Sequence, residues 1–291
     1  MIKFFKQRKE KKARLSSYLK PKWTQLNLDQ NKDDGQPADL ILDFATLEKK
    51  GFLTPDTLLT DLARDYSGVK RSLFQRLDYF RKGASGADRS QRPNGETPCP
   101  VVLLTSGSPG EGKTFSSCNL AMSLALEERL KVLLIDADLA KPSTPEAFGY
   151  DVDKPGLFEY LHDPSEPIDR FILKTKPLPI KILPAGDATS SPAQLLASQI
   201  MIDLVNSLAT QTRKYDIIIM DGPPLLATTE AAALAPLADE VIIVVGTGDT
   251  TVDEIGSSLD FLGGTDHVSL LMNRIYFQEA KTSNYPYGEA A

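Results

Sequence analysis

The feature that most limits the fold of this chain is a glycine-rich loop between an apolar run and a segment of helical periodicity. The loop reads Gly-Ser-Pro-Gly-Glu-Gly-Lys-Thr from Gly107 to Thr114 and follows the apolar residues 101–105. It matches G-x-x-x-x-G-K-[ST], in which the glycines let several backbone N–H groups converge on one anion at a helix N-terminus. The lysine brings positive charge to the terminal phosphates of a nucleotide, and the threonine hydroxyl is a ligand for Mg²⁺. The pattern therefore predicts a phosphate-binding loop.

Short apolar runs alternate with longer helical segments from residue 101 onward. Consecutive apolar residues are typical of strands that are buried on both faces of a parallel sheet. The alternation predicts an α/β fold with a doubly wound, mainly parallel sheet flanked by helices. The expected strands are 101–105, 132–136, 180–184, 217–221, 241–246 and 268–273. The expected helices between them are 114–128, 192–210, 229–237 and 251–262.

Changes in composition divide the chain into five parts. We expect a basic and polar N-terminal extension that is partly disordered, a helix, a linker, an ATP-binding P-loop domain and a flexible tail that contains tyrosines. The boundaries of these parts are 1–55, 56–82, 83–100, 101–275 and 276–291.

Charge is distributed unevenly along the chain. The net charge is −6, although residues 1–23 contain nine Lys and Arg against one acid. The acidic remainder would repel a nucleic acid duplex, so no nucleic-acid partner is expected.

The cysteines and the apolar runs indicate where the chain is located. The two cysteines, Cys99 and Cys118, fit a reducing cytosol, and no apolar run reaches the roughly 20 residues of a membrane span. We expect a cytoplasmic protein, with peripheral attachment of the basic segment to the inner face of the cell membrane as an open alternative to a solvated tail.

Two more of the predicted strands end in acidic residues. Asp136 and Asp138 follow one apolar strand, and Asp221 ends another. The carboxyl ends of parallel strands share the sheet edge that carries the loop, so these carboxylates should lie near the phosphates. Mg²⁺ prefers hard oxygen ligands, although an aspartate after a strand can also cap a turn. The expected metal ligands are Thr114, Asp136, Asp138 and Asp221.

The motifs around these residues resemble those of a known family. TSGSPGEGKT, LLIDADLAKPS and IIIMDGPP look like the Walker A, A′ and B motifs of bacterial tyrosine kinases, the autokinases of capsule and exopolysaccharide export. The resemblance runs from about residue 65 to 287 and is strongest to the soluble autokinases of exosortase-linked exopolysaccharide loci. It implies ATP and Mg²⁺ as cofactors and a protein tyrosine as the phosphate acceptor.

The resemblance also implies a role for individual residues. Lys113 would bind the phosphates, and Asp136 would be the base beside the incoming tyrosine hydroxyl. Asp138 and Asp221 would organise the metal. The expected nucleotide contacts are Gly107, Ser108, Pro109, Gly110, Glu111, Gly112, Lys113, Thr114, Phe115 and Asn273, the last of these near the adenine ring or as a turn cap. The expected phosphate acceptors in the tail are Tyr276, Tyr285 and Tyr287.

The family partner that the resemblance implies is a membrane chain-length-determinant protein, a polysaccharide co-polymerase, that activates the kinase in trans. A homo-oligomer is also implied. Residues Asp65, Gly68 and Arg71 stand where the family often has E-x-x-R-x-x-R for ring assembly, which leaves ring formation open.

Two alternatives to a kinase remain. A MinD/ParA-type positioning ATPase shares the expected sheet, but it has a lysine where this chain has Ser108. An ATP-binding, non-catalytic regulator of a polysaccharide export complex would use the same loop and aspartates without turnover.

Overall fold

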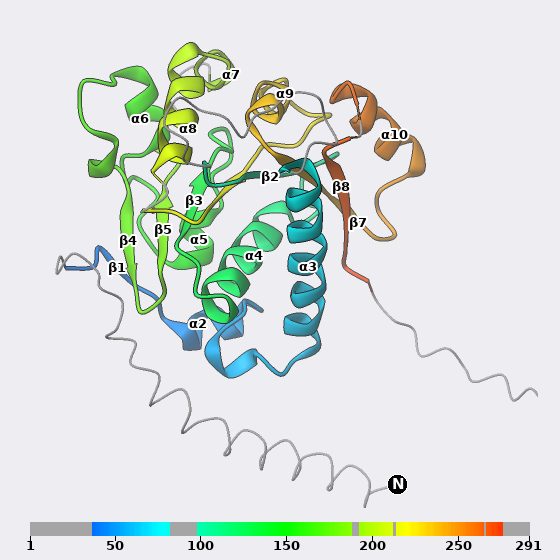
Figure 1. Cartoon of the computed structure of the whole chain (residues 1–291), viewed down its shortest axis with the longest axis horizontal. Coiled ribbons are helices and arrows are strands. Elements are labelled where there is room, and N and C mark those ends of the chain that lie inside the picture. The colour runs from blue at the N-terminus through cyan, green and yellow to red at the C-terminus, as the bar shows by residue number, and fades with distance from the viewer. Residues whose placement is uncertain (1–36, 82–97, 188–191, 212–213, 265, 276–291) are drawn as a thin grey trace, which may run out of the picture.

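A computed structural model describes residues 37–81, 98–187, 192–211, 214–264 and 266–275. Within them, strands form one sheet in the order β1-β4-β5-β3-β6-β2-β7-β8. Neighbouring strands are parallel except β4 and β5, which are antiparallel. Figure 1 shows β1 and β8 at opposite ends of this sheet, with helices around it. The predicted α/β class with a mainly parallel sheet is confirmed.

Most elements lie where the sequence predicts them. The strands are β1 (Leu40–Ile41), β2 (Val101–Ser106), β3 (Val132–Asp136), β4 (Leu173–Lys176), β5 (Ile180–Leu183), β6 (Ile217–Asp221), β7 (Glu240–Gly246) and β8 (Val268–Asn273). The helices are α2 (Phe44–Lys49), α3 (Asp61–Arg81), α4 (Lys113–Glu127), α5 (Thr144–Phe148), α6 (Leu157–His162), α7 (Pro192–Leu196), α8 (Gln199–Thr210), α9 (Glu230–Leu234) and α10 (Val252–Phe261). The single helix predicted for 192–210 is instead two helices, because Ser198 caps a new helix by accepting a hydrogen bond from the Met201 N–H.

Side chains of the central strands alternate between two apolar layers. On β2, Val102 and Leu104 pack with α3 and α4, whereas Val101 and Leu103 pack with α8 on the other face. The same alternation holds on β3 and β6, as expected for strands whose successive side chains point to opposite faces. Both faces are therefore buried, which explains why these strands are apolar throughout.

The segment before α3 contributes to the core. Leu42, Leu47 and Leu53 are buried in the same layer as α4, and the Leu53 N–H donates to Asn119 Oδ1 at 2.8 Å. These residues fall inside the 1–55 region that the sequence assigns to a polar extension. Its apolar residues are too few and too irregularly spaced to predict β1 and α2, which are short and are stabilised by tertiary packing.

Helix α3 packs along α4, as Figure 1 shows, and exposes one of its sides to solvent. Lys70 is buried and pairs with Glu127 at 3.0 Å. Asp65, Gly68 and Arg71 lie on the exposed side, and open space surrounds Gly68. The three positions are thus available at the surface of this helix.

An ion pair between the half-buried Arg76 and the buried Glu240 fixes α3 to β7. Arg76 Nε donates to Glu240 Oε1 at 2.5 Å, and its Nη2 donates to the carbonyl oxygens of Asp266 and Val268 at 3.1 Å. The Glu240 side chain is 1% exposed and also accepts a hydrogen bond from Ser269. These contacts of Arg76, here called the clamp, therefore link α3 to both β7 and β8.

Removing the cation of this clamp is expected to destabilise the fold. Arg76→Met leaves a buried carboxylate without its ion-pair partner, which costs about 3 kcal/mol of unfolding free energy. Urea unfolding measures the loss. The double variant Arg76→Met, Glu240→Gln removes the buried charge and should recover at least half of it. An unchanged unfolding midpoint for Arg76→Met would show that the pair contributes nothing.

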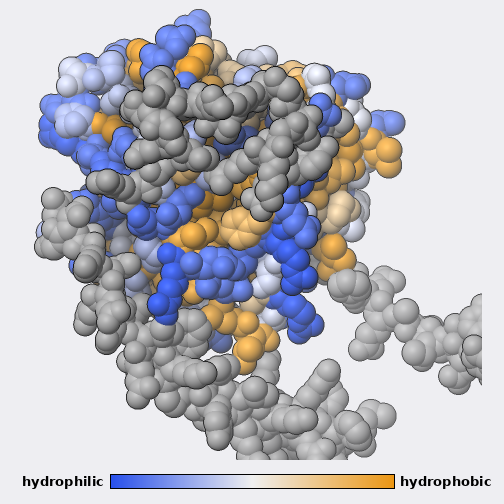
Figure 2. All heavy atoms as spheres, viewed as in Figure 1, coloured by the Kyte–Doolittle hydropathy of each residue, from blue (hydrophilic) through white to orange (hydrophobic). Residues whose placement is uncertain are grey.

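Apolar side chains remain exposed at the β8 end of the sheet. Figure 2 shows them over α10 and β8, on the right of the view. The larger ones are Val252, Phe261, Leu270, Met272 and Ile275. In the part of the chain that the structure describes, no helix is both long and apolar enough to cross a lipid bilayer.

Candidate active site

The register of two central strands brings two carboxylates together. Asp136 ends β3 and Asp221 ends β6, and the two residues are direct partners across the parallel pair. By the alternation along each strand, both occupy positions on the α4 side of the sheet. Helix α4 begins at Lys113, so its first turn lies over these carboxylates. The predicted meeting of the strand-end aspartates with the loop lysine is what the structure contains.

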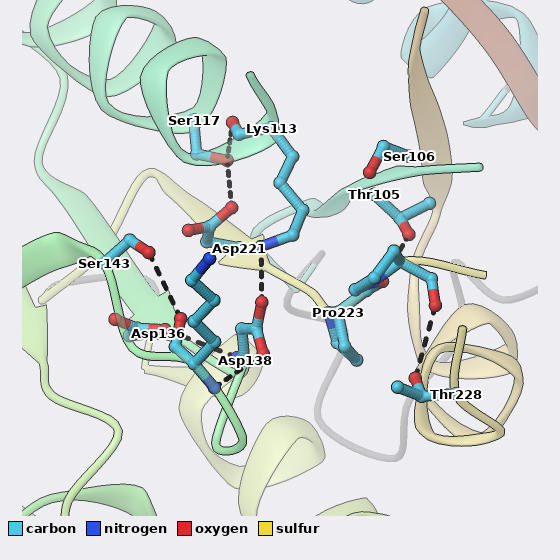
Figure 3. Close-up of polar contacts among 12 residues, drawn as sticks. Thr105, Ser106, Lys113, Ser117, Asp136, Asp138, Ser143, Asp221, Pro223 and Thr228 are labelled. Carbon is cyan, nitrogen blue, oxygen red and sulfur yellow. Dashed lines mark hydrogen bonds and ion pairs between the residues drawn. The ribbon is translucent and has the colours of Figure 1, made fainter. Parts of the chain in front are cut away.

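Lys113 lies inside this acidic cluster. Its Nζ is 2.5 Å from Asp138 Oδ2, and both side chains are buried. Figure 3 shows Lys113, Asp138 and Asp221 pointing toward one another. Burial lowers the pKa of Lys113, but the charges of Asp221, Asp138 and Asp136 outweigh it, so that its pKa is raised. The lysine is therefore held as a cation that neutralises part of the carboxylate charge.

Asp221 has one bonded and one unbonded oxygen. Ser117 lies one helical turn after Lys113 and donates from its Oγ to Asp221 Oδ1 at 2.9 Å. The other oxygen, Oδ2, is buried and has no hydrogen-bond partner among the residues that the structure describes. Burial raises the pKa of Asp221, while Lys113, Thr114 and Ser117 act in the opposite direction. A buried carboxylate oxygen that lacks a partner next to a threonine hydroxyl fits a cation ligand.

Asp136 is held by residues that follow it in the chain. Its Oδ2 accepts hydrogen bonds from Thr144 Oγ1 at 2.6 Å and from the Thr144 N–H at 3.2 Å. Its Oδ1 has a longer contact, 3.3 Å, with the Asp138 N–H. Burial and the charge of Asp221 raise the pKa of Asp136 to about 7, against the lowering effect of the Thr144 hydrogen bonds.

The phosphate loop is shaped from outside by residues at the end of β8. Gly110 and Gly112 have φ angles of 86° and 94°, a left-handed region that favours glycine. Asn273 Nδ2 donates to the Glu111 carbonyl at 2.9 Å, and Arg274 donates to the Gly110 carbonyl. Since the C=O and N–H of a trans peptide point in opposite directions, these contacts turn the next two N–H groups toward the interior of the loop.

Glu111 fastens the same loop from within. Its carboxylate accepts a hydrogen bond from the Ser108 N–H at 2.8 Å and another from the Thr250 hydroxyl. A cavity of about 230 Å³ adjoins this side of the loop. Its lining residues are Ser108, Pro109, Gly110, Glu111, Asp249, Thr250, Glu254 and Arg274.

Other predicted site residues take different positions. The Phe115 ring packs against the Phe52 ring with centroids 5.3 Å apart and lies in the apolar layer between α4 and the segment before α3. Asn273 lies against Gly112, where a Cβ would come within 2.1 Å of its Nδ2. The predicted acceptors Tyr276, Tyr285 and Tyr287 lie outside the described residues.

The predicted metal ligands do not form a closed cage. Among the residues that the structure describes, no three His, Cys, Asp or Glu side chains are arranged to hold a metal on their own. Mg²⁺ commonly keeps several waters and needs only one or two carboxylates besides phosphate oxygens. Thr114 and Asp221 fit that requirement best, because Asp136 and Asp138 already bond to Thr144 and Lys113. Roles for Asp136 and Asp138 at a metal stay predictions.

Sequence reasoning missed several residues of this site. Ser117 could have been found, since four residues after Lys113 is one turn along the same helix face. Thr144 and Tyr150 had no motif to mark them, and Arg274 follows a strand whose end the sequence linked only to Asn273.

Comparison with known proteins identifies the fold and its relatives. The family described as AAA domain matches residues 101–262, more than half of the chain. The putative tyrosine-protein kinase EpsB of Ralstonia nicotianae is 31% identical over 188 residues, which are 65% of this chain and 24% of EpsB. The tyrosine-protein kinase YwqD of Bacillus subtilis is 34% identical over 161 residues, which are 55% of this chain and 65% of YwqD.

A solved structure agrees with these matches. The crystal structure of the VpsO kinase domain superposes with a TM-score of 0.56 at 33% sequence identity, over 61% of this chain and 86% of that domain. The chain spans about a quarter of the length of EpsB and just under two thirds of YwqD.

Proposed function

Since this chain belongs to the AAA domain family and to the bacterial P-loop tyrosine kinases, we propose that it transfers the terminal phosphate of ATP to protein tyrosines, its own included. The observation that carries the proposal is the convergence of Lys113, Asp136 and Asp221 beside the phosphate loop. Phosphoryl transfer depends mainly on positioning and on charge neutralisation, and these residues supply both.

The residues of the loop would bind the phosphates of ATP. The N–H groups at Glu111 and Gly112 and the start of α4 would face them, since Asn273 and Arg274 hold the loop carbonyls on the other side. Thr114 and Asp221 would hold Mg²⁺, which when bound neutralises phosphate charge. The cavity beside Glu111 would receive the base and ribose end of the nucleotide.

Lys113 and Asp136 would act on the reacting groups. Lys113 would exchange its contact with Asp138 for the terminal phosphates, because its flexible stem can redirect the ammonium group. Asp136 would accept the proton of the tyrosine hydroxyl at its less occupied oxygen, Oδ1. A phenol has an ordinary pKa of about 10 and keeps its proton at neutral pH, so a carboxylate beside it assists the transfer.

The setting of the reaction belongs to the same proposal. EpsB and YwqD carry the name of tyrosine-protein kinases, and the motifs of this chain resemble kinases of exopolysaccharide and capsule export. We propose that the chain acts in that process in the cytoplasm, peripherally at the membrane and in the form of an oligomer. A membrane chain-length-determinant protein would activate it in trans, and Tyr276, Tyr285 and Tyr287 would accept phosphate.

Incubation of the purified chain with labelled ATP and Mg²⁺ tests this function. We expect phosphotyrosine, located by mass spectrometry at Tyr285 or Tyr287, and none in the triple variant in which the three tail tyrosines are replaced by phenylalanine. Phosphate release without phosphotyrosine would instead indicate a positioning ATPase. ATP binding with neither product, even with the activating partner added, would indicate a non-catalytic regulator.

A further inference from the structure

A chain of hydroxyl groups leads from the half-buried Tyr150 through the buried Thr144 to Asp136. Tyr150 Oη lies 2.5 Å from Thr144 Oγ1, which lies 2.6 Å from Asp136 Oδ2. Thr144 is fully buried and Tyr150 is half-buried against the α4 layer. Neither residue belongs to the phosphate loop or to the predicted site.

The direction of these hydrogen bonds follows from the number of protons. A carboxylate that serves as a base can only accept hydrogen bonds, so Thr144 must donate its single hydroxyl proton to Asp136. Thr144 Oγ1 can then only accept from Tyr150, whose O–H is the remaining donor. The chain therefore runs in one direction, from Tyr150 through Thr144 to Asp136, and each bond polarises the next.

The local fold places the two hydroxyl residues together. Thr144 is the first residue of α5, and its N–H also bonds Asp136. The helix ends after five residues at Gly149, whose φ of 77° lets the chain reverse. The Gly149 and Tyr150 N–H groups both donate to the Pro145 carbonyl, which returns Tyr150 to the side of Thr144.

The occupied oxygen of Asp136 determines which oxygen remains for chemistry. Within the described residues, Oδ2 accepts two hydrogen bonds from Thr144, whereas Oδ1 has a single contact, at 3.3 Å, with the Asp138 N–H. We propose that Thr144 and Tyr150 are positioning residues that lock the Asp136 carboxylate by Oδ2 and present Oδ1 to the acceptor hydroxyl. This inference rests on the proposed function of Asp136 as the base.

Isosteric variants test the hydroxyl chain. Thr144→Val removes the hydroxyl and keeps the N–H, so kcat for tyrosine phosphorylation should fall about tenfold while KM for ATP stays within about twofold. Thr144→Ser keeps the donor and should restore most of the activity. Tyr150→Phe should lower kcat about threefold, and it should add nothing in the Thr144→Val background, because Tyr150 acts through Thr144.

Matched controls separate positioning from loss of stability. Thr175→Val removes another buried threonine hydroxyl. Thr175 lies on β4, and its hydroxyl donates to the carbonyl oxygens of Leu178 and Ile180. Tyr215→Phe removes a buried phenol hydroxyl that has no hydrogen-bond partner in the described part of the chain. Both controls are expected to keep the kcat of the wild-type chain.

The outcomes distinguish this inference from the proposed function. If wild-type protein forms phosphotyrosine and Thr144→Val has the same kcat, or if Ser fails to rescue, the positioning role is wrong and the kinase function stands. If wild-type protein releases phosphate without labelling tyrosine, the kinase function is wrong. The rate of phosphate release by the same variants then decides whether Thr144 and Tyr150 orient Asp136. An unchanged rate in Thr144→Val overturns that positioning role.

Discussion

Lys113→Met is expected to lower phosphotyrosine formation by at least about a hundredfold, as the loss of a charge that stabilises a transition state does. Labelling with radioactive ATP at saturating Mg²⁺ measures the effect. The structure adds a second expected result. Because Lys113 Nζ pairs with Asp138 at 2.5 Å in a buried cluster, the variant should also lose about 3 kcal/mol of unfolding free energy.

A double variant separates these two effects. Lys113→Met, Asp138→Asn removes the buried charge left by the first substitution, so its unfolding midpoint should return toward that of the wild-type chain. Its labelling should stay as low as that of Lys113→Met, because the cation that contacts the phosphates is still missing. Recovery of labelling together with stability, or labelling by Lys113→Met above a tenth of the wild-type level, would contradict the assigned role of Lys113.

Asp136→Asn is expected to lower kcat by about a hundredfold or more, since a positioned base commonly contributes that factor. Binding of ATP should change by less than about threefold, because the loop and Asp221 remain in place. Single-turnover labelling gives the first quantity, and calorimetric titration with ATP and Mg²⁺ gives the second. Asn keeps the shape of the side chain and an oxygen that can accept from Thr144.

The control for this variant lies at the opposite end of a central strand. Asp216 precedes β6, and its Oδ2 accepts a hydrogen bond from the Lys131 N–H at 2.7 Å. Asp216→Asn is expected to retain activity. If Asp136→Asn weakened ATP binding more than it slowed turnover, Asp136 would be reassigned from the base to nucleotide binding.

Local sequence patterns predict most of the fold and the centre of the candidate site. Central strands buried on both faces must be apolar throughout, so β2, β3, β6 and β7 could be found from the sequence. The glycine loop and the strand-end aspartates are then brought together by any parallel sheet. Short β1 and β4 could not be found in this way, because their two and four residues are stabilised by pairing with each other and with β5.

The surroundings of the site depended on tertiary contacts that no pattern marks. Thr144 and Tyr150 meet because Gly149 ends α5, and a glycine after a few helical residues is common in loops. The burial of Lys113 could also not be predicted from the sequence, since a lysine in a glycine-rich loop is ordinarily expected to be solvent-exposed. The acceptor tyrosines remain predictions, because the structure does not describe residues 276–291.

Because Asp136 and Asp221 are direct partners across β3 and β6, the backbone pairing of these strands sets the distance between the two carboxylates. Neighbouring strands are roughly 4.8 Å apart, and side-chain rotamers can adjust that spacing only slightly. A slip of β3 by one residue would send its carboxylate to the opposite layer. The specific activity of refolded protein is therefore proportional to the fraction of molecules in which β3 and β6 pair in the correct register. It would detect a shifted register that leaves the secondary-structure content, and so the circular dichroism spectrum, unchanged.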